Sequence, residues 1–396
     1  MKRLVILTTA LLVATSAFAQ DRPDDAEESI ANLETAPTAP LALPPVSAAA
    51  LAVENEEGAL RLWLDGSGAL VMPGTFNFAG GGAVPVSGAG SRLMWLPERA
   101  AFRAGRVTGA QWDPANIGSY SIAFGANTTA SGNFSTAMGF NTLAGGENSL
   151  ATGFNTEASG LRSTAMGFNR RASGSSSLAT GSYSEAAGSR STAMGYNTRA
   201  SGSSSLATGA TTEAAGNFST AMGYRAKSLH SGTFVWADFT NADFASTGDN
   251  QFLIRAGGGV GIGTNNPTER LHVAGNVRAS AFVTTSDARF KTAVAPIVGA
   301  REAVLALRGV RYEWDRAAHP EADFPEGRQL GFIAQQVRDV LPELVREGSD
   351  GTLSVAYSQL VPVLVEALRE QQAENDALTA RLERLERMME MMASRD

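Results

Sequence analysis

The sequence predicts a mainly β protein whose central part is a solenoid of fourteen-residue turns. The pattern Ser-x-Ala-x-Gly returns at every fourteenth position in eight copies, from Ser121 to Ser219. Within each copy the small residues alternate with a period of two, which is typical of a short strand. The chain is also rich in glycine, with 42 residues. A fixed period in a small-residue composition indicates stacked turns rather than one large packed core.

Composition excludes several classes of site. The chain of 396 residues carries 32 basic and 39 acidic side chains, a formal net charge of −7, which removes the usual electrostatic case for binding nucleic acid. It has no Cys, so disulfides, thiolate zinc sites and cysteine nucleophiles are excluded. His230, His272 and His319 lie far apart and lack metal-ligand spacing. We therefore expect no metal and no cofactor.

The segment 1–19 is typical of a signal peptide. Lys2 and Arg3 precede the short apolar run 4–13, and Ala17-Phe18-Ala19 fits the cleavage pattern. An uncleaved anchor helix is the alternative, but this run is short for a membrane span. No later run is long enough, so we expect no integral membrane segment in the mature chain. The protein is predicted to be exported, to a bacterial cell surface or the extracellular medium.

Two segments precede the repeats. Residues 20–50 contain five prolines among Ala, Thr and acidic residues, and are predicted to form an extended linker. Residues 51–118 form a β-rich amino-terminal head segment. Its candidate strands are 60–64 and 93–96, separated by glycine-rich connections.

The repeats themselves fill residues 119–231. A second phase, Ala-x-Gly, follows each Ser-x-Ala-x-Gly, for example at Ala130 and Gly132. Between the small residues the copies alternate, Thr-x-Met in one and Leu-x-Thr in the next, which gives a superperiod of two copies. The pattern fixes the phase of the strand but leaves open which face lies inside the coil. One apolar side chain per strand buries little surface, so association between chains is expected to add stability.

These copies resemble the head repeats of YadA-like trimeric autotransporter adhesins. The matching elements are Ser-Thr-Ala-Met-Gly and Ser-Leu-Ala-Thr-Gly, each followed by Ala-x-Gly. The resemblance implies a left-handed parallel β-roll, with three rolls around one axis. That family ends in a membrane anchor, whereas this chain ends in a charged helix.

A β-rich neck is predicted at 232–283. Its segment from Gly261-Ile262-Gly263-Thr264 to Leu271-His272-Val273 resembles the short β segment that precedes tail-fibre chaperone domains. The remaining residues, 284–396, change in character. We predict a helix near 297–307, a strand at 310–314, a strand leading into a helix at 329–337, and a long final helix.

Residues 284–396 resemble the peptidase S74 family, the intramolecular chaperones of endosialidase tailspikes and related fibres. The resemblance rests on Ser286-Asp287-x-Arg289-x-Lys291 and on Gly-Phe-Ile-Ala-Gln-Gln-Val at 331–337. Phe290 stands where Leu is more usual. The resemblance implies one self-cleavage at the Thr285–Ser286 bond.

In that scheme Ser286 is the nucleophile and Lys291 the general base, with Asp287 and Arg289 as structural support. A lysine can act as a base only when its surroundings favour the neutral amine, as burial at a subunit interface does. The residues alone support a second interpretation. Ser286 or Asp287 caps a helix, and Lys291 is solvated.

The final helix, 360–393, carries a heptad seam typical of a coiled coil. Gln371 and Asn375 interrupt the seam, and such polar residues set register or oligomeric state. Positions spaced alternately four and three apart form it: Leu364, Leu368, Gln371, Asn375, Leu378, Leu382, Leu385, Met389 and Met392. Heptads do not distinguish two strands from three; the homotrimer is implied by the two resemblances.

The function predicted from these features is an exported homotrimeric fibre or adhesin-like surface protein. Its carboxyl-terminal chaperone would assemble the trimer and then cleave before Ser286. The alternatives are a trimerisation clamp that never cleaves and a phage or prophage tail fibre for host recognition. A host-surface, glycan or matrix ligand is possible in each case, and the sequence does not identify it. An enzyme for external substrates is not expected, because paired carboxylates, a His triad and a metal cluster are all missing from the sequence.

Overall fold

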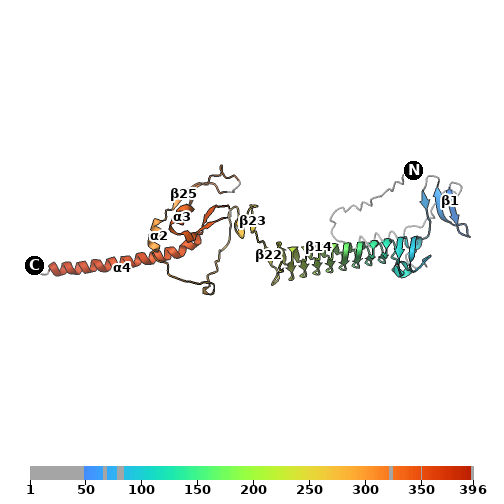
Figure 1. Cartoon of the computed structure of the whole chain (residues 1–396), viewed down its shortest axis with the longest axis horizontal. Helices are drawn as coiled ribbons and strands as arrows, with labels where there is room; N and C mark the ends of the chain where they lie inside the picture. Colours follow the sequence, from blue (N-terminus) through green and yellow to red (C-terminus); the bar gives the residue numbers. More distant parts are fainter. Residues whose placement is uncertain (1–48, 66–68, 78–83, 321–323, 349, 394–396) are drawn as a thin grey trace.

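A computed structural model describes residues 49–65, 69–77, 84–320, 324–348 and 350–393. The predicted signal peptide and nearly all of the predicted linker lie outside these residues. The described chain is elongated, with a β rod at one end, a small mixed module near the middle and a long helix at the other end (Figure 1). The predicted mainly β solenoid with a carboxyl-terminal helix is therefore confirmed.

The rod is a parallel solenoid in which each long strand pairs with the strand one turn away. Thr136 lies opposite Leu150, and Leu150 opposite Thr164, so one sequence repeat makes one turn. Short strands form the second wall, and β10 and β11 run through both walls. The long strands are β5 (Ala101–Val107), β6 (Ile122–Ala126), β8 (Thr136–Phe140), β10 (Leu150–Ala158), β11 (Thr164–Ala172), β12 (Leu178–Ser182), β14 (Thr192–Tyr196), β16 (Leu206–Ala210), β18 (Thr220–Tyr224), β20 (Phe234–Ala237) and β22 (Phe252–Arg255). The short strands are β7 (Thr129–Ala130), β9 (Leu143–Ala144), β13 (Glu185–Ala186), β15 (Arg199–Ala200), β17 (Glu213–Ala214), β19 (Ala226–Ser228) and β21 (Phe244–Ala245).

The small-residue face lies inside the coil, which settles the question that the sequence left open. Ala137, Ala151 and Ala165 are fully buried, and Ser135 and Ser163 beside them are buried as well. The two walls approach closely because most side chains between them are Ala, Ser or Thr; Arg103 and Arg170 are large exceptions. The interior is thus a narrow column of methyl and hydroxyl groups rather than a conventional core of large apolar side chains.

Each long strand from β6 to β18 contains a glycine, because the backbone of the next turn leaves no room for a side chain there. Gly153 has φ of 118°, and a Cβ on it would lie 2.1 Å from the carbonyl oxygen of Gly167 in the next turn. Left-handed residues that are not glycine recur every seven positions, at two corners per turn. They run through Asn127, Phe134, Asn141, Asn148, Asn155, Arg162, Asn169, Ser176, Tyr183, Arg190, Asn197, Ser204, Thr211, Phe218 and Arg225. Asparagine is common among them because it tolerates this conformation.

The two outer walls differ in chemistry. The long-strand wall carries apolar side chains from one end of the rod to the other, among them Phe124, Met138, Met166, Met194 and Trp236, each 36–40% exposed. The short-strand wall alternates in charge. Its outward residues in successive turns are Glu157, Arg171, Glu185, Arg199, Glu213 and Lys227, which form ion pairs 3.5–3.6 Å long. Both walls follow the superperiod of two copies.

The amino-terminal end of the rod is closed by the head segment. Strand β4 (Gly90–Leu96) pairs antiparallel with β5, and β1 (Ala49–Glu54), β2 (Leu60–Asp65) and β3 (Leu70–Val71) form a separate antiparallel sheet. Short 3-10 turns follow at η2 (Pro97–Arg99), η3 (Ala110–Trp112) and η4 (Pro114–Asn116). The fully buried Trp112 donates from Nε1 to the carbonyl oxygen of Thr128 at 2.8 Å. Trp112 thereby anchors the head on the first turns.

The parallel ladder continues beyond residue 231. Strands β20 and β22 extend the long-strand wall into the predicted neck. A carboxylate clamp then closes the rod. Asp238 accepts hydrogen bonds from Arg255 Nε at 3.0 Å and from the backbone N–H groups of Thr240 and Gly257. A small parallel pair, β23 (Val260–Ile262) and β24 (Leu271–Val273), follows.

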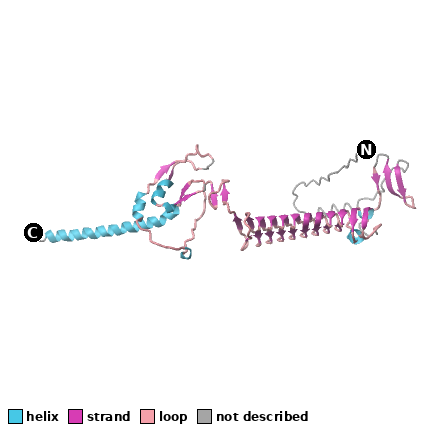
Figure 2. Cartoon of the chain, in the orientation of Figure 1, coloured by secondary structure: helices cyan, strands magenta, loops and turns pink. Residues whose placement is uncertain are grey.

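The carboxyl-terminal module is a small α+β unit in which α2 packs on the start of α4 (Figure 2). Its core consists of Ala300, Val337, Leu344, Leu360, Val363 and Ala367. The carboxylate of Glu370 on α4 accepts the N–H groups of Ala300 and Arg301, and so caps α2 from outside the helix. The elements are η5 (Ala288–Phe290), α2 (Ala300–Ala306), β25 (Val310–Tyr312), β26 (Gln329–Gly331), α3 (Ala334–Val340), η6 (Pro342–Leu344), β27 (Val345–Glu347), β28 (Leu353–Val355), η7 (Tyr357–Gln359) and α4 (Leu360–Ala393).

Candidate functional site

The candidate site lies on an exposed arm, residues 275–299, that connects the neck to α2. Every residue of this arm is exposed. In Figure 1 it is the loop that runs below the module, away from its strands and helices. Its large apolar side chains are among the most exposed of the described chain, with Phe282 at 77%, Val283 at 93% and Val298 at 84%. Large exposed apolar side chains gathered on one segment are typical of an interaction surface.

Ser286 and Lys291 meet on this arm. Lys291 Nζ donates to Ser286 Oγ at 2.8 Å, so the two groups lie within the hydrogen-bonding distance that a nucleophile and its base require. The single 3-10 turn η5 lies between them and brings residues five positions apart together. Thr285, whose carbonyl carbon is the predicted site of attack, directly precedes the nucleophile.

Asp287 and Arg289 hold the turn. The Asp287 side chain caps η5 by accepting the N–H of Arg289 at 2.9 Å, and it pairs with the guanidinium at 2.7 Å. The hydrogen bonds from the Arg289 side chain and backbone lower the pKa of Asp287, and the same pair raises the pKa of Arg289. The guanidinium carbon also lies 5.9 Å from the ring centre of Phe290. In the structure Asp287 therefore caps η5, and Ser286 is in hydrogen-bond contact with Lys291.

The segment that begins with this dyad matches a known family. Residues 286–346 match the peptidase S74 family. The description of that family is "chaperone of endosialidase". The matched S74 segment starts at Ser286, the residue that follows the predicted scissile bond, and it includes Lys291 and both residues of the supporting pair.

The rod matches a second family and the chain has curated relatives. The YadA head domain repeat matches residues 117–142, 144–169, 172–198 and 200–226. The long tail fiber proteins Gp37 of Enterobacteria phages K3 and T2 are each 35% identical over 115 residues, which is 28% of this chain. The aligned part is only 8% of the length of either relative. The chain therefore combines an S74 segment with YadA-type head repeats and resembles a part of tail fibre proteins.

The predicted coiled-coil seam lies on the exposed side of α4. Leu368, Leu378 and Leu382 are 50–70% exposed, whereas Leu360 and Val363 at the start of the helix are buried in the module. The polar seam residue Gln371 accepts a hydrogen bond from Arg301 Nε at 2.9 Å within the same chain. The first seam turns are thus docked on α2, and the later ones extend beyond the module.

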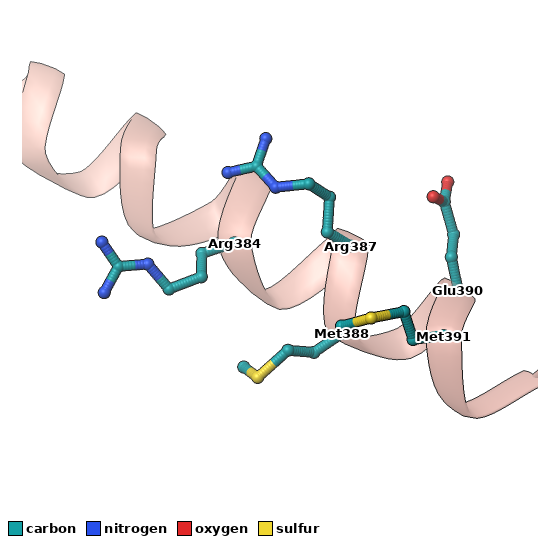
Figure 3. Close-up of a pocket in the computed structure, with 5 residues that line it drawn as sticks. All are labelled: Arg384, Arg387, Met388, Glu390 and Met391. Carbon is teal, nitrogen blue, oxygen red and sulfur yellow. The ribbon is translucent and has the colours of Figure 1, made fainter.

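The far end of α4 bears a shallow hollow without convergent groups. Five side chains line it, from Arg384, Arg387, Met388, Glu390 and Met391. Figure 3 shows that all of them project from one helix. Across the described residues no helix is both long and apolar enough to cross a membrane.

Three acidic residues after the repeats have separate structural partners. Besides Asp238 in the clamp, Asp243 pairs with Arg225 at 2.9 Å, and Asp249 accepts the N–H of Ser231 at 2.9 Å. Sequence reasoning did not find the clamp, because Asp238 and Arg255 are 17 positions apart and belong to no repeat phase. It also passed over Arg170, although this is the one copy in which arginine replaces the inward Thr or Ser of the short strand.

Proposed function

We propose that the protein is an exported homotrimeric fibre whose S74 segment serves as an intramolecular chaperone and cleaves the chain once, between Thr285 and Ser286. The observation that carries the proposal is the 2.8 Å contact between Lys291 Nζ and Ser286 Oγ at the first residue of the S74 segment. The YadA-type repeats and the likeness to phage tail fibre proteins support the fibre.

Two apolar surfaces that are exposed in the described part of the chain support assembly of several copies. One is the long-strand wall of the rod, in which Met and Leu alternate along the superperiod. The other is the seam of α4. The charged short-strand wall of the same rod is suited to solvent, so the two walls have distinct roles. Exposed apolar patches that run the length of a molecule mark protein interfaces, and a second and third copy of this chain carry the same patches.

The chemistry of the cleavage follows from the dyad. The neutral amine of Lys291 takes the proton of Ser286 Oγ, and Oγ attacks the carbonyl carbon of Thr285. The C–N bond breaks as the lysine returns the proton to the amide nitrogen, which leaves an ester between Thr285 and Ser286. Water then hydrolyses the ester, giving a new carboxylate on Thr285 and a new amino terminus on Ser286.

Assembly would switch this chemistry on. Both groups of the dyad are exposed in the single chain. If the exposed arm packs against neighbouring copies, its apolar residues are covered and the lysine loses water, which favours the neutral base. Cleavage would therefore report that the trimer has formed.

Intact-mass measurement of the purified chain tests the proposal. The wild-type protein should yield a released piece that begins at Ser286 and ends at Asp396. Ser286→Ala and Lys291→Met should stay uncut and still form trimers, because one loses the nucleophile and the other the base. Ser280→Ala, an exposed serine on the same arm, should be cut like the wild type. Cleavage that persists in Ser286→Ala, or occurs at another bond, would falsify the assigned dyad.

Two related functions are distinguished by the mass measurement and by locating the protein. A wild-type trimer that stays intact would be a permanent trimerisation clamp on a structural fibre, which the exposure of the dyad in the single chain favours. The likeness to Gp37 favours a phage or prophage tail fibre for host recognition. Detection of the protein on bacterial cells or in phage particles distinguishes that function from a cellular surface fibre.

A further inference from the structure

Arg170 is an exception to the composition of the solenoid interior. It lies opposite Thr156 of the preceding turn, at the inward position of the short-strand wall. Its side chain is only 2% exposed. A guanidinium is therefore enclosed in a coil whose other inward side chains in these turns are Ser, Thr and Ala.

The guanidinium of Arg170 has no hydrogen-bond partner among the described residues, at Nε, Nη1 or Nη2. The second buried arginine of the rod shows that this is not a general property of the coil. Arg103 donates to Ser121 Oγ at 2.7 Å, to the Ser121 carbonyl oxygen at 2.9 Å and to the Ala130 carbonyl oxygen at 3.0 Å. The coil can satisfy a buried guanidinium from its own oxygens, and it does not do so for Arg170.

The charge on Arg170 persists at neutral pH. Burial lowers its pKa to about 10, which still leaves the group protonated. The buried residues of the described chain include no Asp or Glu. Glu157 in the adjoining turn points outward and pairs with Arg171 at 3.6 Å. An enclosed charge without a counter-charge is strongly unfavourable.

Hydroxyl groups of the same turns can act as donors. The hydroxyl groups of Thr156, Ser163 and Ser177 are buried and unpartnered in the described structure, and each can rotate to present its hydrogen. Together with the three guanidinium nitrogens they would surround an acceptor. Because the fully buried Ala158 and Ala172 adjoin this position, that acceptor has to be small, and because the arginine is charged, it has to be an anion.

We propose that the solenoid binds a small monovalent anion, of the size of chloride, beside Arg170. The ion neutralises the guanidinium and accepts hydrogen bonds from the surrounding hydroxyls. It is a structural part of the head, since it is held between stacked turns. The site is independent of the dyad and of cleavage.

Bromide tests the site directly, because it replaces chloride and scatters X-rays anomalously. Crystals of the full chain grown in sodium bromide should show an anomalous peak inside the coil, within hydrogen-bonding distance of the Arg170 guanidinium. A coil without a bromide peak there, or one in which the guanidinium binds only water or carbonyl oxygens, would overturn the proposal.

Matched variants test the energetic role. At constant ionic strength, with gluconate as the replacing anion, the wild-type unfolding midpoint should rise with chloride concentration, because a ligand of the folded state stabilises it. Arg170→Thr introduces the residue that the preceding turn has at this position, Thr156, and should lose this chloride dependence. Arg171→Thr removes the same charge one position away, on the outer wall, and should keep it. Equal chloride dependence in the two variants would contradict the assignment.

Discussion

At the scale of single residues, the roll depends on backbone conformations that most side chains disfavour. Two corners of each turn hold a left-handed residue, and where the sequence offers asparagine the side chains also form a ladder. Asn141 donates to Asn155 at 2.7 Å, and Asn155 donates to Asn169 at 2.6 Å. Thr211 occupies such a corner with φ of 56°, which is unusual for a β-branched residue. The copies therefore differ in local strain.

Replacing Thr211 with Asn should raise the free energy of unfolding by about 1 kcal/mol, because asparagine adopts the left-handed conformation at lower cost. Chemical denaturation of the full chain measures the change. Thr211→Ala is the control, since alanine keeps the Cβ that causes the strain. An equal gain with alanine would show that the threonine side chain, rather than its backbone, limits stability.

The buried inner face of the rod leads to a second prediction at the scale of single residues. Ala165→Asp should destabilise the roll by several kcal/mol, because it places an unpaired charge on the fully buried face. Ser175→Asp, at an exposed turn ten residues away, should change stability by less than about 0.5 kcal/mol. Thermal unfolding of the two variants compares them. Equal transition midpoints would be incompatible with the observed inward face.

At the scale of elements, the rod ends at the clamp, where the carboxylate of Asp238 accepts hydrogen bonds from three residues. Hydrogen bonds from Thr240, the Gly257 backbone and Arg255 hold the pKa of Asp238 well below its usual range. The carboxylate therefore stabilises the fold at pH values above its unfolded pKa of about 3.9, and this contribution is lost as the pH falls. Acid should loosen the end of the ladder at β20 and β22.

Asp238→Asn should lower the unfolding midpoint at pH 7, because the charged hydrogen bonds to Arg255 and the backbone are weakened. The difference from the wild type should shrink at pH 3, because Asp238 of the unfolded chain then takes up a proton that the folded carboxylate does not, which favours the unfolded wild type. Circular dichroism melts at the two pH values measure this. A difference that stays constant between pH 7 and pH 3 would rule out a role for the ionised carboxylate.

Elements that repeat along the chain could be predicted from the sequence, whereas contacts that occur only once were missed. The fourteen-residue period was enough to predict the solenoid and its strand phase, because every turn restates the same pattern. It could not show that Ser135 and Ala137 point inward, since both faces of the strand alternate equally well. Likewise the spacing of Ser286 and Lys291 did not establish contact. Their meeting depends on η5, which Asp287 caps.

At the scale of the whole molecule, assembly and cleavage are expected to be coupled through α4. Leu378→Asp combined with Leu382→Asp places charges on the exposed seam and should abolish both the trimer and the cut at Ser286. Ala380→Asp combined with Arg384→Asp keeps the same spacing on another side of the helix and should leave both intact. Light scattering gives the mass and gel mobility gives the cut. Cleavage in a monomeric seam variant would separate the two processes.

The superperiod sets a rule for how such a rod can change length. Removing two turns, 178–205, would join Met166 to a Leu-x-Thr turn and Arg171 to Glu213, so both outer walls would keep their alternation. Removing a single turn, 178–191, would preserve the ladder but stack Arg171 directly on Arg199 and place two methionine turns in succession. Like charges in adjacent strands repel. Insertions or deletions of two turns are therefore expected to be tolerated better than those of one turn. Only a change by an even number of turns keeps the alternation on both outer walls.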